Sequence, residues 1–162
     1  MIYFVSDTHF YHQNVIDFEK RPFKTVEQMN ETIINNWNSV VGKDDTVYHL
    51  GDFGFGNKTK LIKIGEMLNG KKHLIVGNHD WKYTDTVLKR FGFCEITRSP
   101  FVLNDKYILT HRPQSEIKDG YINLFGHVHS NSNIKTVTDT HICLCVERWN
   151  YTPVSLESIS KL

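Results

Sequence analysis

The sequence Met1-Ile2-Tyr3-Phe4-Val5 leads directly into Ser6-Asp7-Thr8-His9, so an apolar run is followed by small, acidic and imidazole side chains. The same succession occurs four more times along the chain. The later apolar runs span residues 46–50, 72–76, 107–110 and 121–125. Each of the five runs is four or five residues long, rich in β-branched or aromatic residues and bounded by turn residues, which predicts a strand.

Helical patterns lie between these strands. Thr25 and Gln28 have the spacing of a capping box. The apolar residues after them recur at helical spacing and are Met29, Ile33, Ile34, Trp37 and Val41. Trp37 is therefore predicted to lie in the core. A second helix is indicated by Leu61, Ile64, Met67 and Leu68, and Gly70 is placed to stop it.

The second half of the chain has a different pattern. A third helix is predicted from Thr84 to Phe91-Gly92, and residues 101–110 have the pattern of a hairpin around Asn104-Asp105-Lys106. A last short helix is predicted with Ser155 as its cap. Early β-α-β units followed by hairpins predict an α/β protein in which two mixed β-sheets pack face to face.

Composition favours an ordinary globular domain. The chain has 162 residues, 40% apolar and 23% charged, and no linker or low-complexity tract interrupts it, so residues 1–162 are predicted to form a single domain. The formal net charge is +1, with both signs mixed along the sequence. This balance argues against binding to a long nucleic-acid duplex or to a membrane surface, and it leaves a nucleotide or a nucleic-acid end open as a substrate.

The cysteines and the first residues indicate the compartment. Cys94, Cys143 and Cys145 fit neither a disulfide framework nor a zinc ribbon, and the last two are predicted to share one face of a strand as small apolar side chains. The first apolar run ends at Asp7, too early for a signal peptide or a membrane-spanning helix. A cytoplasmic protein is expected.

Metal-binding side chains stand where the predicted strands end. The candidate ligands are Asp7, His9, Asp52, Asn78, His111, His127 and His129. Residues two apart in extended chain share a side, and glycines precede three of the seven, which would permit turns that aim these side chains outward. Each motif alone occurs often by chance, but the whole ordered set, each at the carboxyl end of a strand, is distinctive.

The ordered set resembles the signature of the calcineurin-like metallophosphoesterases, which runs D-x-H, G-D, G-N-H-[D/E], H and G-H-x-H. Here the elements are Asp7-Thr8-His9, Gly51-Asp52, Gly77-Asn78-His79-Asp80, His111 and Gly126-His127-Val128-His129. The chain is most similar to the small bacterial, archaeal and phage members of phosphodiesterase type. The resemblance implies a four-layer αββα sandwich, two mixed β-sheets flanked by helices.

The resemblance also implies two divalent ions. It assigns Asp7, His9 and His129 to one ion and Asn78, His111 and His127 to the other, with Asp52 bridging both. Oxygen and imidazole ligands without thiolate suit manganese, iron, nickel, cobalt or zinc, and manganese is the first expectation. A hydroxide between the ions would attack the phosphorus in line with the leaving group. No serine, cysteine or aspartate is placed with a base as a nucleophile, so no covalent intermediate is expected.

Other residues receive roles by the same resemblance or by position. His79 is expected to donate a proton in catalysis, with Asp80 orienting its ring. His12, Asn14 and Arg112 follow metal ligands closely enough to reach a substrate phosphate, and surface positions without a function are equally compatible with the sequence. Arg21 and Arg148 are weaker candidates for contact with phosphate. His49 is predicted to be a packed core histidine.

Several functions remain open. Phosphoprotein phosphatases follow the G-D with an Asp-Arg pair, whereas Phe53-Gly54-Phe55-Gly56 follows it here, so a phosphodiester substrate is preferred over a phosphomonoester or a phosphoprotein. Phe53 and Phe55 are expected to border the site, where they would suit an apolar or base-like group. The alternatives are a phosphomonoesterase and a non-catalytic metal-binding scaffold with this fold. A structural zinc site is disfavoured, because such sites prefer cysteine.

Overall fold

The computed structural model describes residues 1–162, and its first β-sheet has five strands in the order β4-β3-β2-β1-β9. The strands are β1 (Ile2–Val5), β2 (Thr46–His49), β3 (Lys71–Ile75), β4 (Phe93–Thr97) and β9 (Val154–Ser155). Strands β1 to β4 are parallel and β9 is antiparallel to β1. All the predicted strands of this sheet are present.

Helices form the crossovers between the parallel strands. They are α1 (Gln13–Phe18), α2 (Val26–Val40), α3 (Lys58–Met67) and α4 (Asp85–Arg90), and α5 (Leu156–Ile159) follows β9. Ser155 caps α5, as predicted, and Thr84, where the third helix was predicted to start, caps α4. The capping box of α2 forms only in part, because the side chain of Gln28 accepts from the N–H of Lys24 (2.9 Å) rather than that of Thr25.

The second sheet has four strands in the order β5-β6-β7-β8. They are β5 (Phe101–Leu103), β6 (Tyr107–Leu109), β7 (Ile122–Phe125) and β8 (His141–Cys143). The predicted hairpin joins β5 and β6, which are antiparallel, and the other pairs are parallel. Asn104 and Asp105 belong to the three-residue loop between the paired Leu103 and Tyr107 and have φ angles of +53° and +50°. The N–H of Lys106 closes the turn by donating to the carbonyl of Leu103 (3.2 Å).

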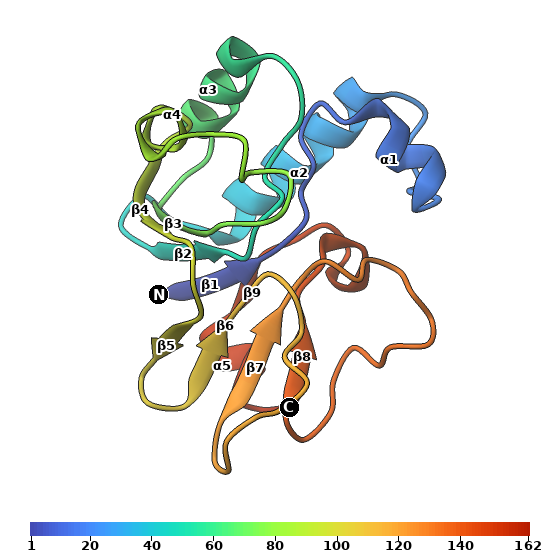
Figure 1. Ribbon diagram of the computed structural model, residues 1–162. Coiled ribbons are helices and arrows are strands. Elements are labelled where there is room, and N and C mark those ends of the chain that lie inside the picture. Colours follow the sequence, from blue (N-terminus) through green and yellow to red (C-terminus); the bar gives the residue numbers. More distant parts are fainter.

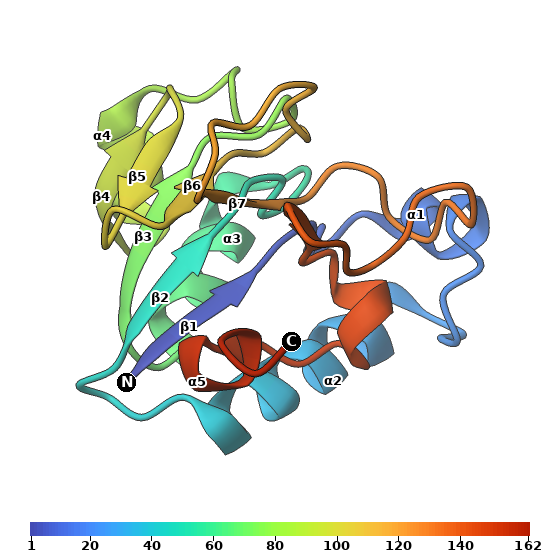
Figure 2. The ribbon, with the colours of Figure 1, turned by 90° about the horizontal axis from the view of Figure 1, so that it is seen from below.

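Figures 1 and 2 show the layers, which two apolar cores hold together. Helices α2, α3 and α4 cover one face of the first sheet, and Trp37 is fully buried in that core. The other face packs on the second sheet through Phe4, Tyr48, Leu109 and Leu124. The structure is thus an α/β sandwich of two mixed sheets flanked by helices, as predicted. None of its helices combines the length and the apolar character needed to cross a bilayer.

The outer face of the second sheet is covered differently. Phe125 and Cys143 point outward there, and Val128 and Ile134 of the segment after β7 pack on them. Cys145 is buried in the same cluster, so the two cysteines lie on one side as predicted, but Cys145 is two residues beyond the end of β8 and not in the strand. The chain then forms a short 3₁₀ helix, η1 (Val146–Trp149).

The two sheets meet where β1 ends. The N–H of Ser6 donates to the carbonyl of Leu144 (2.9 Å), and the N–H of Val146 donates to the carbonyl of Ser6 (3.1 Å). The loop after β1 therefore lies against the segment after β8. This seam brings the carboxyl ends of strands from both sheets to one place.

Candidate metal centre

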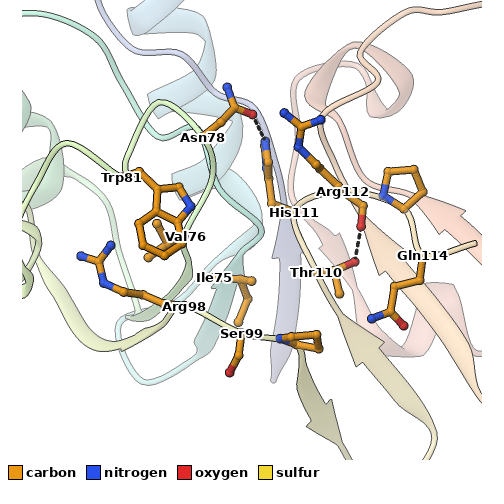
Figure 3. Close-up of a pocket in the computed structure, with 12 residues that line it drawn as sticks. Ile75, Val76, Asn78, Trp81, Arg98, Ser99, Thr110, His111, Arg112 and Gln114 are labelled. Atoms are coloured by element: carbon orange, nitrogen blue, oxygen red, sulfur yellow. Dashed lines mark hydrogen bonds between the residues drawn. The ribbon is translucent and has the colours of Figure 1, made fainter.

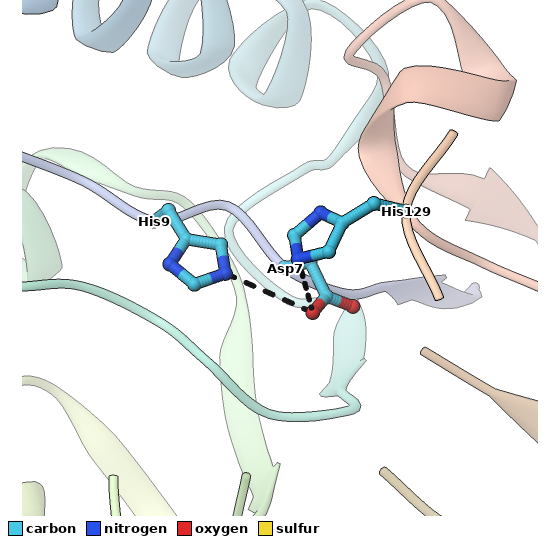
Figure 4. A group of neighbouring side chains, drawn as sticks. All are labelled: Asp7, His9 and His129. Carbon is cyan, nitrogen blue, oxygen red and sulfur yellow. Dashed lines mark ion pairs between the residues drawn. The ribbon is translucent and has the colours of Figure 1, made fainter. Parts of the chain in front are cut away.

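Asp7, His9 and His129 form a first cluster at this seam (Figure 4). The Oδ1 atom of Asp7 lies 3.8 Å from Nε2 of His9 and 3.6 Å from Nε2 of His129. The other oxygen, Oδ2, accepts hydrogen bonds from the N–H of His127 (2.9 Å) and the thiol of Cys145 (3.3 Å). The protein thus fixes one oxygen of Asp7 and directs the other toward two imidazoles.

Two atoms of this cluster fit a cation particularly well. Oδ1 of Asp7 and Nε2 of His9 are buried and have no hydrogen-bond partner. A buried polar atom left without a partner costs about 1–3 kcal/mol, so such atoms are normally satisfied. Here both face the same point, and a metal ion bound there would satisfy them together. The donors are carboxylate oxygen and imidazole nitrogen, which suit a divalent transition metal.

Asp52, His111 and His127 form a second cluster beside the first. Nε2 of His111 lies 3.4 Å from Oδ2 of Asp52 and 3.0 Å from the side-chain oxygen of Asn78. Asn78 thus belongs to this cluster by contact. The rings of His111 and His127 meet edge to face, with centroids 5.1 Å apart. Strands β2, β3, β6 and β7 lead into these four residues.

Asp52 stands between the two clusters. Its Oδ1 accepts from the N–H of His79 (2.9 Å), and its Oδ2 lies 3.7 Å from Nε2 of His9 and 3.4 Å from Nε2 of His111. One oxygen is again held by the backbone while the other faces ligands. Because that oxygen faces one histidine from each cluster, Asp52 has the position of a bridging carboxylate.

The outer nitrogens of two histidines are held by hydrogen bonds. Nδ1 of His129 contacts the carboxylate of Glu147 (2.9 Å), and Nδ1 of His111 contacts the carbonyl of Leu50 (2.7 Å). Such partners fix the ring orientation and place the proton on Nδ1. Nε2 of each ring then faces the cluster as a lone-pair donor, which is the usual arrangement of histidine at a metal.

Arg21 and Glu147 support the first cluster and were not predicted to do so. The Arg21 guanidinium pairs with Glu147 (2.6 Å) and donates to the backbone carbonyls of Asp7 (2.7 Å) and Thr8 (3.0 Å). Arg21 therefore holds the D-x-H loop rather than contacting phosphate. Glu147 lies 126 positions from Arg21 in the sequence, and no local sequence pattern predicts the pair.

The backbone at the ligands is strained. Five of the seven candidate ligands have φ between +46° and +71°, and they are Asp7, His9, Asp52, His127 and His129. Residues other than glycine seldom adopt this left-handed region, and such conformations cluster at functional sites. The strain is a second sign, independent of the side-chain contacts, that these residues serve a site rather than the fold.

Two of the preceding glycines act differently from the prediction. Gly51 has the expected positive φ of 95°. Gly77 and Gly126 are required for lack of space. A Cβ at Gly77 would lie 2.3 Å from Oδ1 of Asp52, and a Cβ at Gly126 would lie 2.3 Å from Oδ2 of Asp7. Larger residues there would displace the two carboxylates.

The charge states of the imidazoles follow from their surroundings. Burial lowers the pKa of His9 well below its usual value, and burial, then the charge of His111, lowers the pKa of His127 to about 4. Burial would also lower the pKa of His111, but its hydrogen bond to Asp52 and the charge of Asp7 outweigh this and raise it to about 9. Carboxylates that draw a proton to His111 also attract a divalent cation, and metal binding would release that proton.

His79 lies at the site, but Asp80 does not orient its ring. The Nε2 atom of His79 is 3.9 Å from Oδ2 of Asp52, and its ring meets that of His9 edge to face at 5.3 Å. The buried carboxylate of Asp80 instead accepts from the N–H groups of Asp52 (2.7 Å), Gly77 (2.9 Å) and Phe53 (3.1 Å). The prediction about Asp80 was wrong in this respect, because the turn directs its side chain into the backbone between two motifs.

The expectation for the two phenylalanines is half correct. Phe53 is only 1% exposed and packs in the core against Phe10 and Phe93. Phe55 is exposed beside the site, where its ring stacks on His12 at 4.6 Å. Residues two apart in a regular strand would share a side, but residues 53–55 do not form a regular strand, and only Phe55 borders the site.

The other predicted residues are placed as follows. Nδ1 of His12 lies 3.2 Å from Nδ1 of His9, so His12 joins the site. Asn14 is exposed on α1 and makes no hydrogen bond to either cluster. Arg112 is exposed beside His111. His49 is fully buried and contacts Thr8 at 2.9 Å, as predicted for a core histidine.

Comparison with known proteins agrees with this geometry. The family model of the calcineurin-like phosphoesterases matches residues 1–151. The chain belongs to this family. The family's activity is the metal-dependent hydrolysis of phosphate esters, and the two ligand clusters are the candidate metal-binding groups of this phosphoesterase.

Relatives of this phosphoesterase occur in archaea, bacteria and phage. The uncharacterized protein MJ1445 of Methanocaldococcus jannaschii is 42% identical over 99% of this chain and 90% of its own length. The Gene 66 protein of Mycobacterium phage L5 is 40% identical over 48% of this chain and 39% of its own length. A crystal structure of a protein of unknown function from Aquifex aeolicus, AQ665, is 31% identical, with a TM-score of 0.76 over 99% of this chain and 98% of that one.

Proposed function

We propose that this phosphoesterase binds two divalent ions and hydrolyses a phosphodiester by in-line attack of water. The observation that carries the proposal is the position of Asp52, whose Oδ2 faces His9 of one cluster and His111 of the other. Asp7, His9 and His129 would hold the first ion, and Asn78, His111 and His127 the second. Manganese is the expected metal, with iron, nickel, cobalt and zinc as alternatives.

The two ions, when bound, would activate the attacking water and stabilise negative charge on the transferred phosphoryl group. The protein's own contribution begins with rigid placement of the ligands. His129 is oriented by Glu147 and His111 by the carbonyl of Leu50. Both rings are therefore held in the orientation that binding needs before any ion arrives.

His79 would supply a proton to the leaving group. Its backbone N–H donates to Asp52, which fixes it beside the clusters, and its side chain is 37% exposed. Neither of the two ligand clusters includes His79, so its imidazole remains available for proton transfer. Arg112 and His12 border the same place and would contact the phosphate, whereas nothing in the structure supports Asn14 in that role.

A diester is preferred as substrate because the arginine that grips a phosphomonoester in phosphoprotein phosphatases is missing after Gly51-Asp52. The exposed ring of Phe55 beside His12 offers an apolar contact for a second ester group. We further propose that residues 1–162 act as one catalytic domain. A cytoplasmic location stays a prediction.

Hydrolysis of bis(4-nitrophenyl) phosphate and of 4-nitrophenyl phosphate tests the proposal directly. The protein should be stripped with a chelator, reloaded with manganese and assayed on both esters, while elemental analysis counts the ions. Two ions per chain and a higher kcat/KM on the diester are expected. Faster turnover of the monoester would refute the diester preference. Absence of turnover on either ester with every divalent metal tried would favour a non-catalytic scaffold.

A further inference from the structure

A groove of about 330 Å³ opens beside the second cluster (Figure 3). Asn78 and His111, both assigned to that cluster, form part of its wall, and Trp81, Arg98 and Arg112 form much of the rest. The volume lies at the lower end of the range of small-ligand sites. A group attached to a phosphate at the metal centre would therefore enter this groove first.

Trp81 presents an aromatic surface to the groove. The residue is 57% exposed, although most tryptophans are largely buried. Its backbone is fixed, because its N–H donates to the carbonyl of Gly77 (3.2 Å) in the turn that carries Asn78 and His79. In Figure 3 its ring lies between Arg98 on one side and His111 on the other.

Arg98 holds one face of this ring. Its guanidinium lies 4.9 Å from the centroid of the Trp81 ring. The same group is bound to the carboxylate of Asp85 (2.8 Å) and to the carbonyl of Tyr83 (2.8 Å). The arginine is thus anchored and its charge is paired, so its contribution at this place is to support the ring. A flat group entering the groove would meet a ring that is already positioned.

The remaining charge of the groove is positive. No aspartate or glutamate lines it, and Arg112 has no carboxylate partner, whereas Arg21 and Arg98 both do. The backbone of Arg112 is held by a hydrogen bond from Thr110 to its carbonyl (2.7 Å). An anion next to a flat apolar group is the ligand that these residues complement.

We propose that the groove binds the nucleobase of a nucleotide phosphodiester, with the base stacked on Trp81 and phosphate oxygen contacted by Arg112. This inference rests on the proposed diesterase function and names its substrate class. Stacking on an exposed aromatic ring tolerates all bases, because every base has a flat face. The modest net charge of the chain agrees with a short substrate rather than a duplex.

Calorimetry with two ligands that differ only in the base tests the inference. The metal-loaded protein should bind thymidine 5′-monophosphate more tightly than 2-deoxyribose 5-phosphate. Trp81→Ala should weaken binding of the nucleotide about 5- to 150-fold, which corresponds to the usual strength of base stacking, and Trp81→Phe should restore most of it. Arg112→Ala should weaken both ligands alike. The control Phe18→Ala removes an exposed aromatic ring that does not line the groove, and it should leave the ratio of the two affinities unchanged.

Equal affinity of the wild-type protein for the two ligands, or an unchanged nucleotide affinity in Trp81→Ala, would overturn the inference. The failure of the proposed function is separable, because it would appear as absence of manganese-dependent hydrolysis of bis(4-nitrophenyl) phosphate. If the diesterase function and the base-binding groove are both confirmed, comparison of kcat/KM for a dinucleotide and for a 3′,5′-cyclic nucleotide shows which of these two carries the bound base. The better substrate should lose more activity than the poorer one in Trp81→Ala.

Discussion

Replacing Arg21 with alanine removes the cation from a buried ion pair that joins the loop after β1 to η1. The side chain of Arg21 is 0% exposed and that of Glu147 is 6% exposed. Loss of one partner from such a pair typically costs about 3–5 kcal/mol, since the other charge remains buried. His129 stays beside Glu147 and offsets part of this cost, whereas the carbonyls of Asp7 and Thr8 lose their donor and add to it.

For a domain of this size, about 1 kcal/mol shifts the melting temperature by about 2–4 °C, so Arg21→Ala should lower Tm by about 6–20 °C. Circular dichroism melts in a chelator measure this shift without a contribution from metal binding. Arg98→Ala is the matched control, because its pair with Asp85 is exposed (29% and 59%) and such pairs contribute about 0.2–1 kcal/mol. If the two variants melt within about 2 °C of each other, the structural role given to Arg21 is wrong.

Three further outcomes are expected. Chelation should remove two ions per chain and abolish turnover, which manganese should restore. Asp52→Asn should lose metal, whereas His79→Ala should keep both ions, as elemental analysis would show. His79→Ala should also lose about 10²- to 10⁴-fold in kcat, and less with substrates that have an acidic leaving group. Loss of metal in both variants would contradict the separate roles given to Asp52 and His79. Burial would raise the pKa of Glu147, but His129 and Arg21 outweigh it and hold that pKa below its usual value. The ionised Glu147 carboxylate therefore stabilises the folded state above about pH 4.3, and this contribution is lost on further acidification. Urea midpoints between pH 6 and 3 should fall less in Glu147→Gln than in the wild type.

The parts of the fold and site that could be predicted rest on local patterns. Each of the five strands that lead into the site was predicted from a short apolar run closed by turn residues, and a candidate ligand follows within three residues. Strands β4 and β9, which lead into no ligand, were not predicted. The convergence of Asp7, Asp52 and Asn78 then follows from the rule that the parallel strands of one sheet, here β1, β2 and β3, present their carboxyl ends together. The hairpin at Asn104-Asp105 and the cap at Ser155 are equally local, and both are present.

The parts that could not be predicted depend on distant contacts. Glu147 reaches His129 and Arg21 only because the segment after β8 pairs with Ser6. Asp80 shows the opposite error, since adjacency to His79 suggested a contact that the turn does not allow. The carboxylate of Asp80 instead accepts hydrogen bonds from the N–H groups of Phe53 and Asp52, 27 and 28 residues away, and from that of Gly77.

The strained ligands connect the stability of the fold with its chemistry. A non-glycine residue in the left-handed region costs about 1–3 kcal/mol, and five candidate ligands are held there. Hydrogen bonds from the N–H of Asp7 to Gly51 (3.0 Å) and of His9 to Asp52 (3.1 Å) keep two of them in place. The fold therefore sets the donors before binding, including the unpartnered Oδ1 of Asp7 and Nε2 of His9. Since a bound cation would satisfy those atoms in the native state alone, metal binding and folding must stabilise each other in this protein.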